Sequence, residues 1–459
     1  MRITFHGAAQ QVTGSAHLLE FGDKKVLLDC GLFDSNRMEM DSPNRRFTFD
    51  PREIDALVIS HAHNDHIGRV PLLVREGFRG PIYVHPATAD ITSVMLRDSA
   101  RIQREDARGG GPRDKAPAEP LFEIHDVESV VDQFQRIPYE TTIELFDGVN
   151  LTLHDAGHIL GSSMVQLDYR EHGRDRRFLF TGDLGRRNTG LLPDPTIVKD
   201  VDILVAESTY GHKELDPNDK LMKQLHAIVA RATRLGGKVI IPAFSLGRTQ
   251  QMAYCFQELF TNHNVRPIPV FVDSPLASRL TDIHREHPES YTPEARALMD
   301  PDPMYFGSKY VEFCQSWDDS RRLNYQTGPM VVIASSGMCE AGRIRHHLRH
   351  AVTDPDNAIV IVSYQADKTL GRQLADGVER ITIMDQWLDL NAAVYVLDGF
   401  SGHADRNDLA WWFAQTGGHI EKAFLVHGET QALEALKPVL QTQVDSEVIV
   451  PSLLDSFEV

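Results

Sequence analysis

The chain has 459 residues, of which 42% are apolar and 24% are charged, and its net charge is −18. This composition is typical of a globular protein of two or three domains without a membrane-spanning segment. The acidic balance argues against a protein that coats nucleic acid non-specifically, although it leaves room for a local basic groove. Four cysteines without a CxxC pair predict reduced thiols and a cytoplasmic location (Cys30, Cys255, Cys314 and Cys339).

The first part of the chain, up to about residue 208, is predicted to consist of strands with short connections. Asp29 follows the apolar run 26–28 and precedes Cys30-Gly31, a pattern typical of a strand followed by a tight turn. The run 54–60 predicts a buried strand, and three histidines and one aspartate follow it within six residues (His61, His63, Asp65 and His66). A helix is expected from Thr88 to about Arg108, with a glycine-rich loop after it at 109–112.

Five more carboxylate or imidazole residues follow apolar runs that resemble strands. They are His158 after 151–154, Asp183 after 178–182, Glu207 after 203–206, His403 after 393–397 and His427 after 423–426. Each residue alone is more simply interpreted as a turn residue, a helix cap or a satisfied loop side chain. Together with Asp29 and the histidine cluster the arrangement occurs seven times, which argues against coincidence.

From about residue 215 the pattern changes to helices and strands in alternation. Helices are expected at 221–235 and 249–260, and buried strands at 238–242, 270–272, 330–334 and 358–362. This alternation predicts a parallel sheet with helices on its faces. Because the polar strand ends flank this block on both sides, we expect an α/β domain (209–385) inserted into a discontinuous metal-binding domain (1–208 and 386–459).

The histidine cluster indicates a metal site. Imidazole and carboxylate together suit zinc or a similar divalent ion. The offsets within the cluster cannot share one helix face, so a strand end that turns into a loop is expected. Such a loop presents ligands to two neighbouring ions more naturally than to one.

These motifs resemble those of the metallo-β-lactamase-fold hydrolases of the β-CASP family, which include the nuclease subunit of the cleavage and polyadenylation factor and its bacterial and archaeal relatives. On this resemblance Asp29 corresponds to the first motif, the cluster 61–66 to the second, His158 to the third and Asp183 to the fourth, while Glu207, His403 and His427 correspond to motifs A, B and C. The resemblance covers essentially the whole chain and implies an αββα sandwich with an inserted β-CASP α/β domain. Asn64 departs from the pattern, where relatives usually carry an apolar residue, but it is not an expected ligand.

The family chemistry gives each residue an expected role. Two Zn²⁺ per chain are expected, one held by His61, His63 and His158 and the other by Asp65, His66 and His427, with Asp183 bridging them. The pair would activate a hydroxide for in-line attack on phosphorus. Asp65 is the expected proton acceptor, and Asp29 either orients a ligand histidine or is only a turn carboxylate. Glu207 is expected to keep His403 protonated as the acid for the leaving oxygen, although His403 acting only on phosphate is an alternative.

The inserted domain contains turns that suit anions. Ser245, Arg248, Ser336 and Arg372 are candidates for holding backbone phosphates, although each is also interpreted as an ordinary helix cap. The basic tract 343–350 predicts a helix whose charged face is either simply solvated or in contact with RNA. RNA held by both domains would have to be single-stranded.

The sequence therefore predicts a zinc-dependent ribonuclease acting on single-stranded RNA in processing or decay, as an endonuclease, a 5′-exonuclease or both. A thioesterase- or lactonase-type hydrolase is an alternative, which the inserted domain argues against. A catalytically silent RNA-binding scaffold is another, and the complete ligand set argues against it. A DNA-directed β-CASP nuclease is a third, and His427 favours the RNA-processing group. No membrane partner is expected, and a homodimer is left open.

Overall fold

The structure is a computed structural model that describes residues 1–34, 42–109, 119–263, 265–299, 310–416 and 420–459. Its contacts divide the chain into two compact units. The first unit comprises residues 1–187, 194–214 and 403–459, and the second comprises 188–193 and 215–402. Among the helices in these ranges, none is both long enough and apolar enough to cross a membrane.

The first unit is built on two β-sheets that pack face to face. One sheet has seven strands, in the order β21 (Ser456–Glu458), β1 (Arg2–Phe5), β2 (His17–Phe21), β3 (Lys24–Leu28), β4 (Ala56–Ile59), β5 (Ile82–Val84) and β6 (Phe134–Arg136). The other has six, in the order β20 (Lys422–Val426), β11 (Ile203–Glu207), β10 (Arg174–Phe180), β9 (Ser163–Glu171), β8 (Val149–Asp155) and β7 (Thr142–Phe146). Side chains from both sheets, among them Phe5, Val58 and Phe178, form one buried hydrophobic cluster. The sheets are therefore the two halves of a sandwich.

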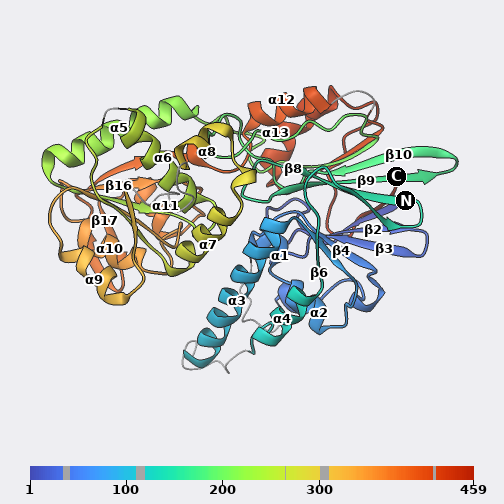
Figure 1. Ribbon diagram of the computed structural model, residues 1–459, viewed down its shortest axis with the longest axis horizontal. Helices are drawn as coiled ribbons and strands as arrows, with labels where there is room; N and C mark the ends of the chain where they lie inside the picture. Colours follow the sequence, from blue (N-terminus) through green and yellow to red (C-terminus); the bar gives the residue numbers. More distant parts are fainter. Residues whose placement is uncertain (35–41, 110–118, 264, 300–309, 417–419) are drawn as a thin grey trace. The chain divides into compact units, whose positions relative to one another are not determined.

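Helices cover the outer faces of this sandwich (Figure 1). The seven-stranded sheet is covered by α1 (Asn64–Ile67), α2 (Val70–Arg75), α3 (Pro86–Gly109) and α4 (Ile124–Asp132), and the six-stranded sheet by α12 (Arg406–Thr416) and α13 (Thr430–Gln441). The fold is thus the expected αββα sandwich. The expected helix 88–108 is confirmed as α3, and residues 110–112 of the expected loop lie outside the described residues.

The strand directions bring polar residues to one edge. Strands β3 and β4 are parallel, with Leu28 opposite Val58, and β10, β11 and β20 are also parallel. Strand β9 is antiparallel to both β8 and β10, so β8 ends at the same edge as β10. Residues that follow the carboxyl ends of these strands are therefore neighbours in space although they are far apart in the sequence.

The second unit has a parallel six-stranded sheet. Its strand order is β14 (Val311–Phe313), β13 (Val270–Asp273), β15 (Met330–Ala334), β12 (Lys238–Pro242), β16 (Ala358–Ile361) and β19 (Ala393–Val396). A separate hairpin pairs β17 (Arg380–Ile383) with β18 (Gln386–Asp389). The helices of this unit are α5 (Asn218–Leu235), α6 (Arg248–Asn262), α7 (Pro275–Glu286), α8 (Pro293–Met299), α9 (Trp317–Tyr325), α10 (Ile344–Ala351) and α11 (Leu370–Ala375). The helix predicted at 249–260 is α6, and the basic tract forms α10.

Strand β19 pairs with β16 along its whole length. By contacts, the chain therefore leaves the second unit only after Gly402. The predicted domain limits, 1–208, 209–385 and 386–459, describe folding domains rather than contact units and stay a prediction.

Candidate metal centre

Seven side chains that can bind metals converge at one edge of the first unit. They form two candidate ligand sets. The first ligand set is His61, His63 and His158, the second ligand set is Asp65, His66 and His427, and Asp183 lies between them. The cluster 61–66 occupies the turn from β4 into α1, while His158, Asp183 and His427 follow β8, β10 and β20.

In the first ligand set, the three rings point nitrogen atoms at a common point. His63 Nδ1 lies 3.1 Å from His61 Nε2 and 3.2 Å from His158 Nε2. Zinc–nitrogen bonds of about 2.0–2.1 Å in a tetrahedron place neighbouring ligand atoms about 3.3–3.4 Å apart. Burial lowers the pKa of His63 to about 3, so this imidazole is neutral, the form that binds metals. The residues therefore fit a divalent ion.

The second ligand set has a similar spacing. His427 Nε2 lies 3.2 Å from His66 Nε2 and 3.4 Å from an Asp65 carboxylate oxygen. Asp183 presents one oxygen to each set: Oδ2 is 3.3 Å from His61 Nε2, and Oδ1 is 3.4 Å from His66 Nε2. One carboxylate thus faces both groups of imidazoles.

Asp183 is buried and unsatisfied. It is 2% exposed, and within the described ranges neither of its oxygens accepts a hydrogen bond. Burial alone would raise the pKa of Asp183, but the surrounding imidazoles, led by His427 and His66, hold it well below its ordinary value. A buried carboxylate without hydrogen-bond donors is costly unless cations neutralise it. This orphaned charge supports a metal-binding role independently of the ligand types.

Asp29 contacts one of these histidines from behind. Its carboxylate Oδ2 lies 2.7 Å from His66 Nδ1, and it accepts hydrogen bonds from the backbone and the hydroxyl of Ser60, each at 2.8 Å. A proton on His66 Nδ1 leaves the Nε2 lone pair directed at the site. Asp29 has a positive φ of 58°, and a side chain at Gly31 would collide with the Asp65 carbonyl. This tight turn therefore holds Asp29 next to the histidine cluster.

Glu207 and His403 form a pair at the same edge. His403 Nδ1 lies 3.4 Å from Glu207 Oε1, whose carboxylate also accepts the amides of Leu184 and Thr209. Burial lowers the pKa of His403, but Glu207 and then Asp183 raise it, and the net pKa lies above the ordinary value. The rings of His403 and His158 are 4.4 Å apart. His403 thus lies beside the ligands with its pKa raised by Glu207.

One interpretation of the sequence was wrong in its geometry. The run 393–397 is not a strand of the sandwich, because β19 lies in the sheet of the second unit. A 3-10 turn (Asp398–Phe400) follows, and a β-bridge to Gly185 holds His403 in the first unit. His403 is therefore presented by a loop rather than by a strand end.

Two hydroxyl residues beside the ligands were not identified from the sequence. Ser60 Oγ lies 3.1 Å from His61 Nδ1 while it donates to Asp29, and Thr209 Oγ1 lies 3.1 Å from His427 Nδ1. Ser60 therefore touches the ring nitrogen of His61 that faces away from the site, whereas the Nδ1 that Thr209 touches on His427 also lies 3.6 Å from Asp183 Oδ1. The available signal was position, since Ser60 directly precedes His61 and Thr209 follows Glu207 by two residues.

The four candidate phosphate-binding residues lie in the second unit and differ in their surroundings. Ser245 Oγ is 2.7 Å from Ser335 Oγ, and Arg248 is the first residue of α6. Ser336 Oγ bonds to Ala341 within its own turn, and Arg372 pairs with Asp376 at 2.9 Å. Ser336 and Arg372 are thus held by neighbours, and a phosphate role for all four stays a prediction.

Comparisons with known proteins give consistent results along the chain. The model of the metallo-beta-lactamase superfamily matches residues 10–243, that of the Beta-Casp domain matches residues 249–374, and that of the Zn-dependent metallo-hydrolase RNA specificity domain matches residues 387–451. The matches follow one another and leave only short segments uncovered.

The chain is also similar to whole proteins. It is 36% identical to "Ribonuclease TTHA0252" of Thermus thermophilus over 96% of each chain. It is 30% identical to "Transcription termination factor FttA" of Methanocaldococcus jannaschii, over all of this chain and 72% of that protein. Among solved structures, a protein of unknown function from Enterococcus faecalis has a TM-score of 0.59 at 14% identity, with 99% of each chain covered, which is a likeness of fold.

Proposed function

The chain belongs to the metallo-β-lactamase superfamily and to its β-CASP branch, and from that premise we propose that it is a zinc-dependent ribonuclease. It hydrolyses phosphodiester bonds of single-stranded RNA in RNA processing or decay. The observation that supports this most is the pair of ligand sets sharing the orphaned carboxylate of Asp183. Metal dependence follows from the family, and the proposal adds that the metal is zinc and that each chain holds two ions.

The proposed roles follow from the contacts. The two ligand sets with Asp183 would hold the ions, which when bound would supply the Lewis acidity that lowers the pKa of a water and offsets charge on the phosphoryl oxygens. Asp65 accepts the proton of the attacking water; its pKa is lowered because neighbouring histidines outweigh its burial, so the carboxylate is ionised. His403, kept protonated by Glu207, donates a proton to the leaving ribose oxygen or offsets its charge. Asp29 fixes the ring of His66.

RNA is favoured over other substrates by the relatives. One similar protein carries the name ribonuclease, and the model matched at 387–451 is an RNA specificity domain. A thioesterase-type hydrolase or a DNA-directed nuclease of the same superfamily is less consistent with both. A cytoplasmic location is a further prediction, and sedimentation velocity decides whether the chain forms the homodimer that the sequence leaves open.

Metal analysis tests the cofactor. Protein purified without added metal should contain close to two equivalents of zinc per chain, and removal by a chelator should abolish hydrolysis until zinc is returned. Full activity at one equivalent would contradict the shared role of Asp183.

A substrate panel tests the activity. Single-stranded RNA, single-stranded DNA of the same sequence, duplex RNA and a thioester are incubated with the protein with and without chelator. Chelator-sensitive cleavage should be fastest on single-stranded RNA, and products from 5′-phosphorylated, 5′-hydroxyl and circular RNA distinguish endonuclease from 5′-exonuclease. Hydrolysis of the thioester alone would refute the proposal.

A further inference from the structure

The surface of helices α9 and α10, which lie side by side in the second unit (Figure 1), carries two exposed aromatic rings. Trp317 is 64% exposed and Tyr325 is 71% exposed. Both lie on α9, and eight residues of helix separate them by about 12 Å along the axis. Arg321 lies halfway, four residues from each, so the three side chains follow one another along the same side of the helix.

Trp317 is exposed but fixed. The guanidinium of Arg343 lies 4.8 Å from the centre of its ring. Arg343 itself is buried, donating to Asp273 Oδ1 at 2.6 Å and to the carbonyl of Cys314 at 3.3 Å. The indole is thus stacked on an anchored cation on one face, while most of the ring remains in solvent. A ring held in this way loses little conformational entropy when a flat ligand stacks on it.

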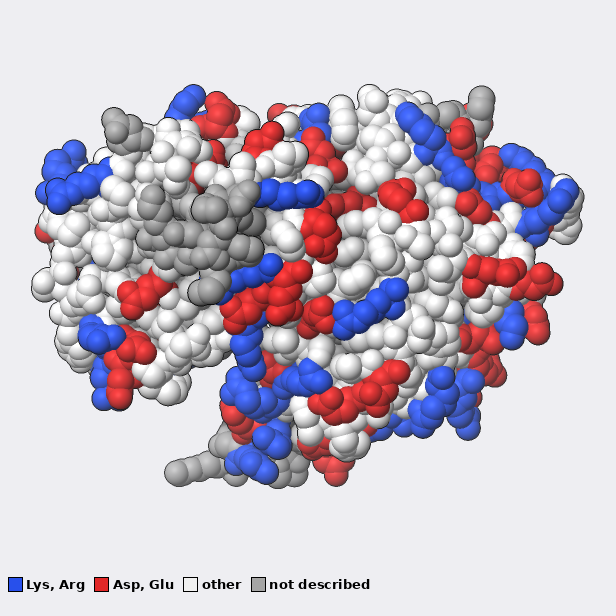
Figure 2. Space-filling view, viewed as in Figure 1, with Lys and Arg blue, Asp and Glu red and all other residues white. Residues whose placement is uncertain are grey.

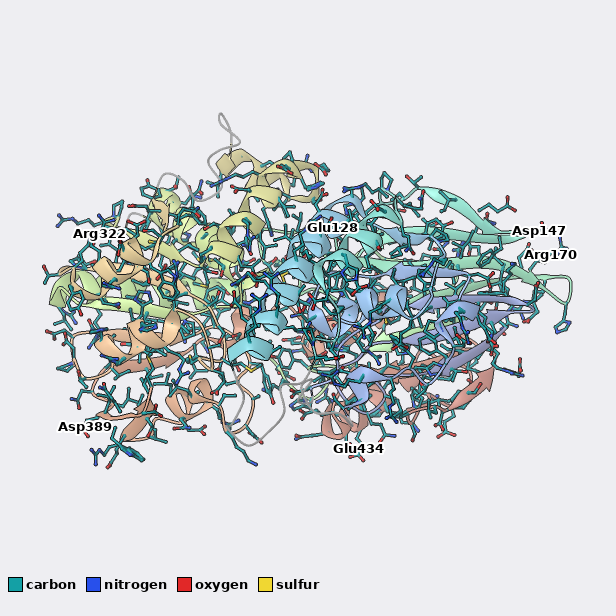
Figure 3. All side chains as sticks on the ribbon, turned by 90° about the horizontal axis from the view of Figure 1, so that it is seen from below. Glu128, Asp147, Arg170, Arg322, Asp389 and Glu434 are labelled. Atoms are coloured by element: carbon teal, nitrogen blue, oxygen red, sulfur yellow. The ribbon has the colours of Figure 1, made fainter. Side chains whose placement is uncertain are left out.

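Tyr325 has a similar support, since the ring centroid of His350 on α10 lies 5.4 Å from its own and the two ring planes meet edge to face at 62°. The charges of the two helices favour an anion. Together they carry four arginines against two aspartates (Arg321, Arg322, Arg345 and Arg349; Asp318 and Asp319). Asp319 is engaged with Ser316 and Arg322, the latter labelled in Figure 3.

The two helices thus carry a local excess of positive charge in a chain of net charge −18. Acidic and basic side chains are interspersed over the face shown in Figure 2.

We infer that the α9–α10 face binds single-stranded RNA, with bases stacked on Trp317 and Tyr325 and phosphates held by Arg321 and Arg349. This rests on the proposed ribonuclease function for its substrate class, and assigns the second unit a contact for RNA beyond the reacting phosphate. Aromatic rings alternating with arginine suit an unpaired strand, whose bases can be splayed out, whereas a duplex hides the faces of its bases. Stacking needs no particular sequence, so the face adds affinity rather than sequence specificity.

Kinetics on RNA of two lengths test this inference. The double variant Trp317→Ala/Tyr325→Ala is compared with Trp387→Ala, a matched control because Trp387 on β18 is 68% exposed and also has an arginine, Arg380, near its ring. For RNA of about 16 nucleotides the double variant should raise KM about tenfold or more with kcat unchanged, and for about four nucleotides neither should change. The control should match the wild type on both, and equal melting temperatures establish that all variants are folded.

Binding measurements separate this inference from the proposed function. Fluorescence anisotropy of labelled RNA is measured in a His403→Ala background, so that cleavage is slow. Arg321→Ala and Arg349→Ala should each reduce the slope of log affinity against log salt by about 0.7.

If the wild type cleaves RNA but KM, anisotropy and salt slope are unchanged in these variants, the inference is overturned and the proposed function stands. If the wild type fails to cleave RNA while its RNA binding depends on Trp317, the proposed function is wrong and the inference about the α9–α10 face is supported. A change of sedimentation coefficient in the double variant with unaltered RNA binding would assign the face to a second copy of the chain instead.

Discussion

Asp183 in the first unit and Asp273 in the second stand at equivalent places and behave in opposite ways. Asp273 ends β13 and Asp183 follows β10 by three residues, and both are almost fully buried. The oxygens of Asp183 accept no hydrogen bond among the described residues. Those of Asp273 accept from Arg343 at 2.6 Å, from Ser320 at 2.5 Å and from His347 at 2.7 Å.

The difference distinguishes a ligand site from a structural network. The imidazoles around Asp183 lie near its oxygens without donating a hydrogen bond to them among the described residues, whereas Arg343, Ser320 and His347 all donate to Asp273. Ser245, Ser274 and Ser335 at the same end of the second sheet are likewise within 2.7–3.2 Å of one another. Convergence of polar residues at strand ends is therefore not sufficient for a metal site; unmet hydrogen-bonding capacity is the deciding observation.

The largest expected effect is that of removing the charge of Asp183. Asp183→Asn should lose bound metal and reduce RNA hydrolysis by more than about 10⁴-fold, beyond what loss of one acid–base group causes. The fold should be retained, because the substitution is isosteric and breaks no hydrogen bond to the carboxylate. Metal analysis, circular dichroism and hydrolysis rates check this. Two equivalents of metal in the variant would show that Asp183 is not shared by the two ligand sets.

The neighbouring rings of His403 and His158 allow a sharper comparison within the first unit. His403→Ala should keep its metal content and slow hydrolysis by about 10²–10⁴-fold, because only proton donation or charge stabilisation is lost. His158→Ala should lose metal as well as activity. If His403→Ala also loses metal, His403 is a ligand and the second ligand set must be redefined.

Asp273→Asn should have the opposite signature from Asp183→Asn. Breaking a buried ion pair by removing one partner should reduce the free energy of unfolding by about 3–5 kcal/mol. Metal content per folded chain should not change. Denaturant unfolding with parallel metal analysis measures both quantities. Loss of metal without loss of stability would contradict the structural role of Asp273.

The difference in free energy of unfolding between the wild type and Asp273→Asn should also depend on pH. Burial would raise the pKa of Asp273, but hydrogen bonds from His347, Ser320 and Arg343 outweigh it and lower the pKa below its ordinary value. The stabilisation is therefore complete above the pKa of an unfolded aspartate, about 3.9, and is lost as the pH falls through the lower folded value. The gap between wild type and Asp273→Asn should narrow only in that acidic range.

The smallest expected effect is that of Asp29→Asn. An amide in place of the carboxylate accepts less strongly from His66 Nδ1, so zinc affinity should fall about 10–100-fold, as is usual for groups that orient a ligand histidine. Asp50→Asn is a suitable control, because the Asp50 carboxylate bonds to Arg52 near the surface. Zinc affinity is measured by competition with a chromophoric chelator. An unchanged affinity in Asp29→Asn would show that Asp29 is only a turn residue.

Much of this fold and site could be predicted because it is encoded locally. An apolar run that ends in His, Asp or Glu beside glycine is visible within ten residues of sequence, and the strands before His61, Asp183 and Glu207 are present as expected. Parallel strands end at a common edge, so the convergence of these residues followed from the predicted topology. His403 was the exception, because its preceding strand joins another sheet.

The sequence by itself determined which residue types stand at the strand ends, and hence the metal chemistry. Only the tertiary structure decided which of them are left unsatisfied. In the sequence, Asp183 and Asp273 are both aspartates at the end of an apolar run. Likewise, Arg372 resembles a free phosphate ligand in the sequence, but in the structure it pairs with Asp376. Whether a buried carboxylate meets a hydrogen-bond donor depends on side chains that are distant in sequence, such as Arg343 for Asp273. Strand-end patterns carry no information about such contacts, because each is fixed by the packing of separate elements.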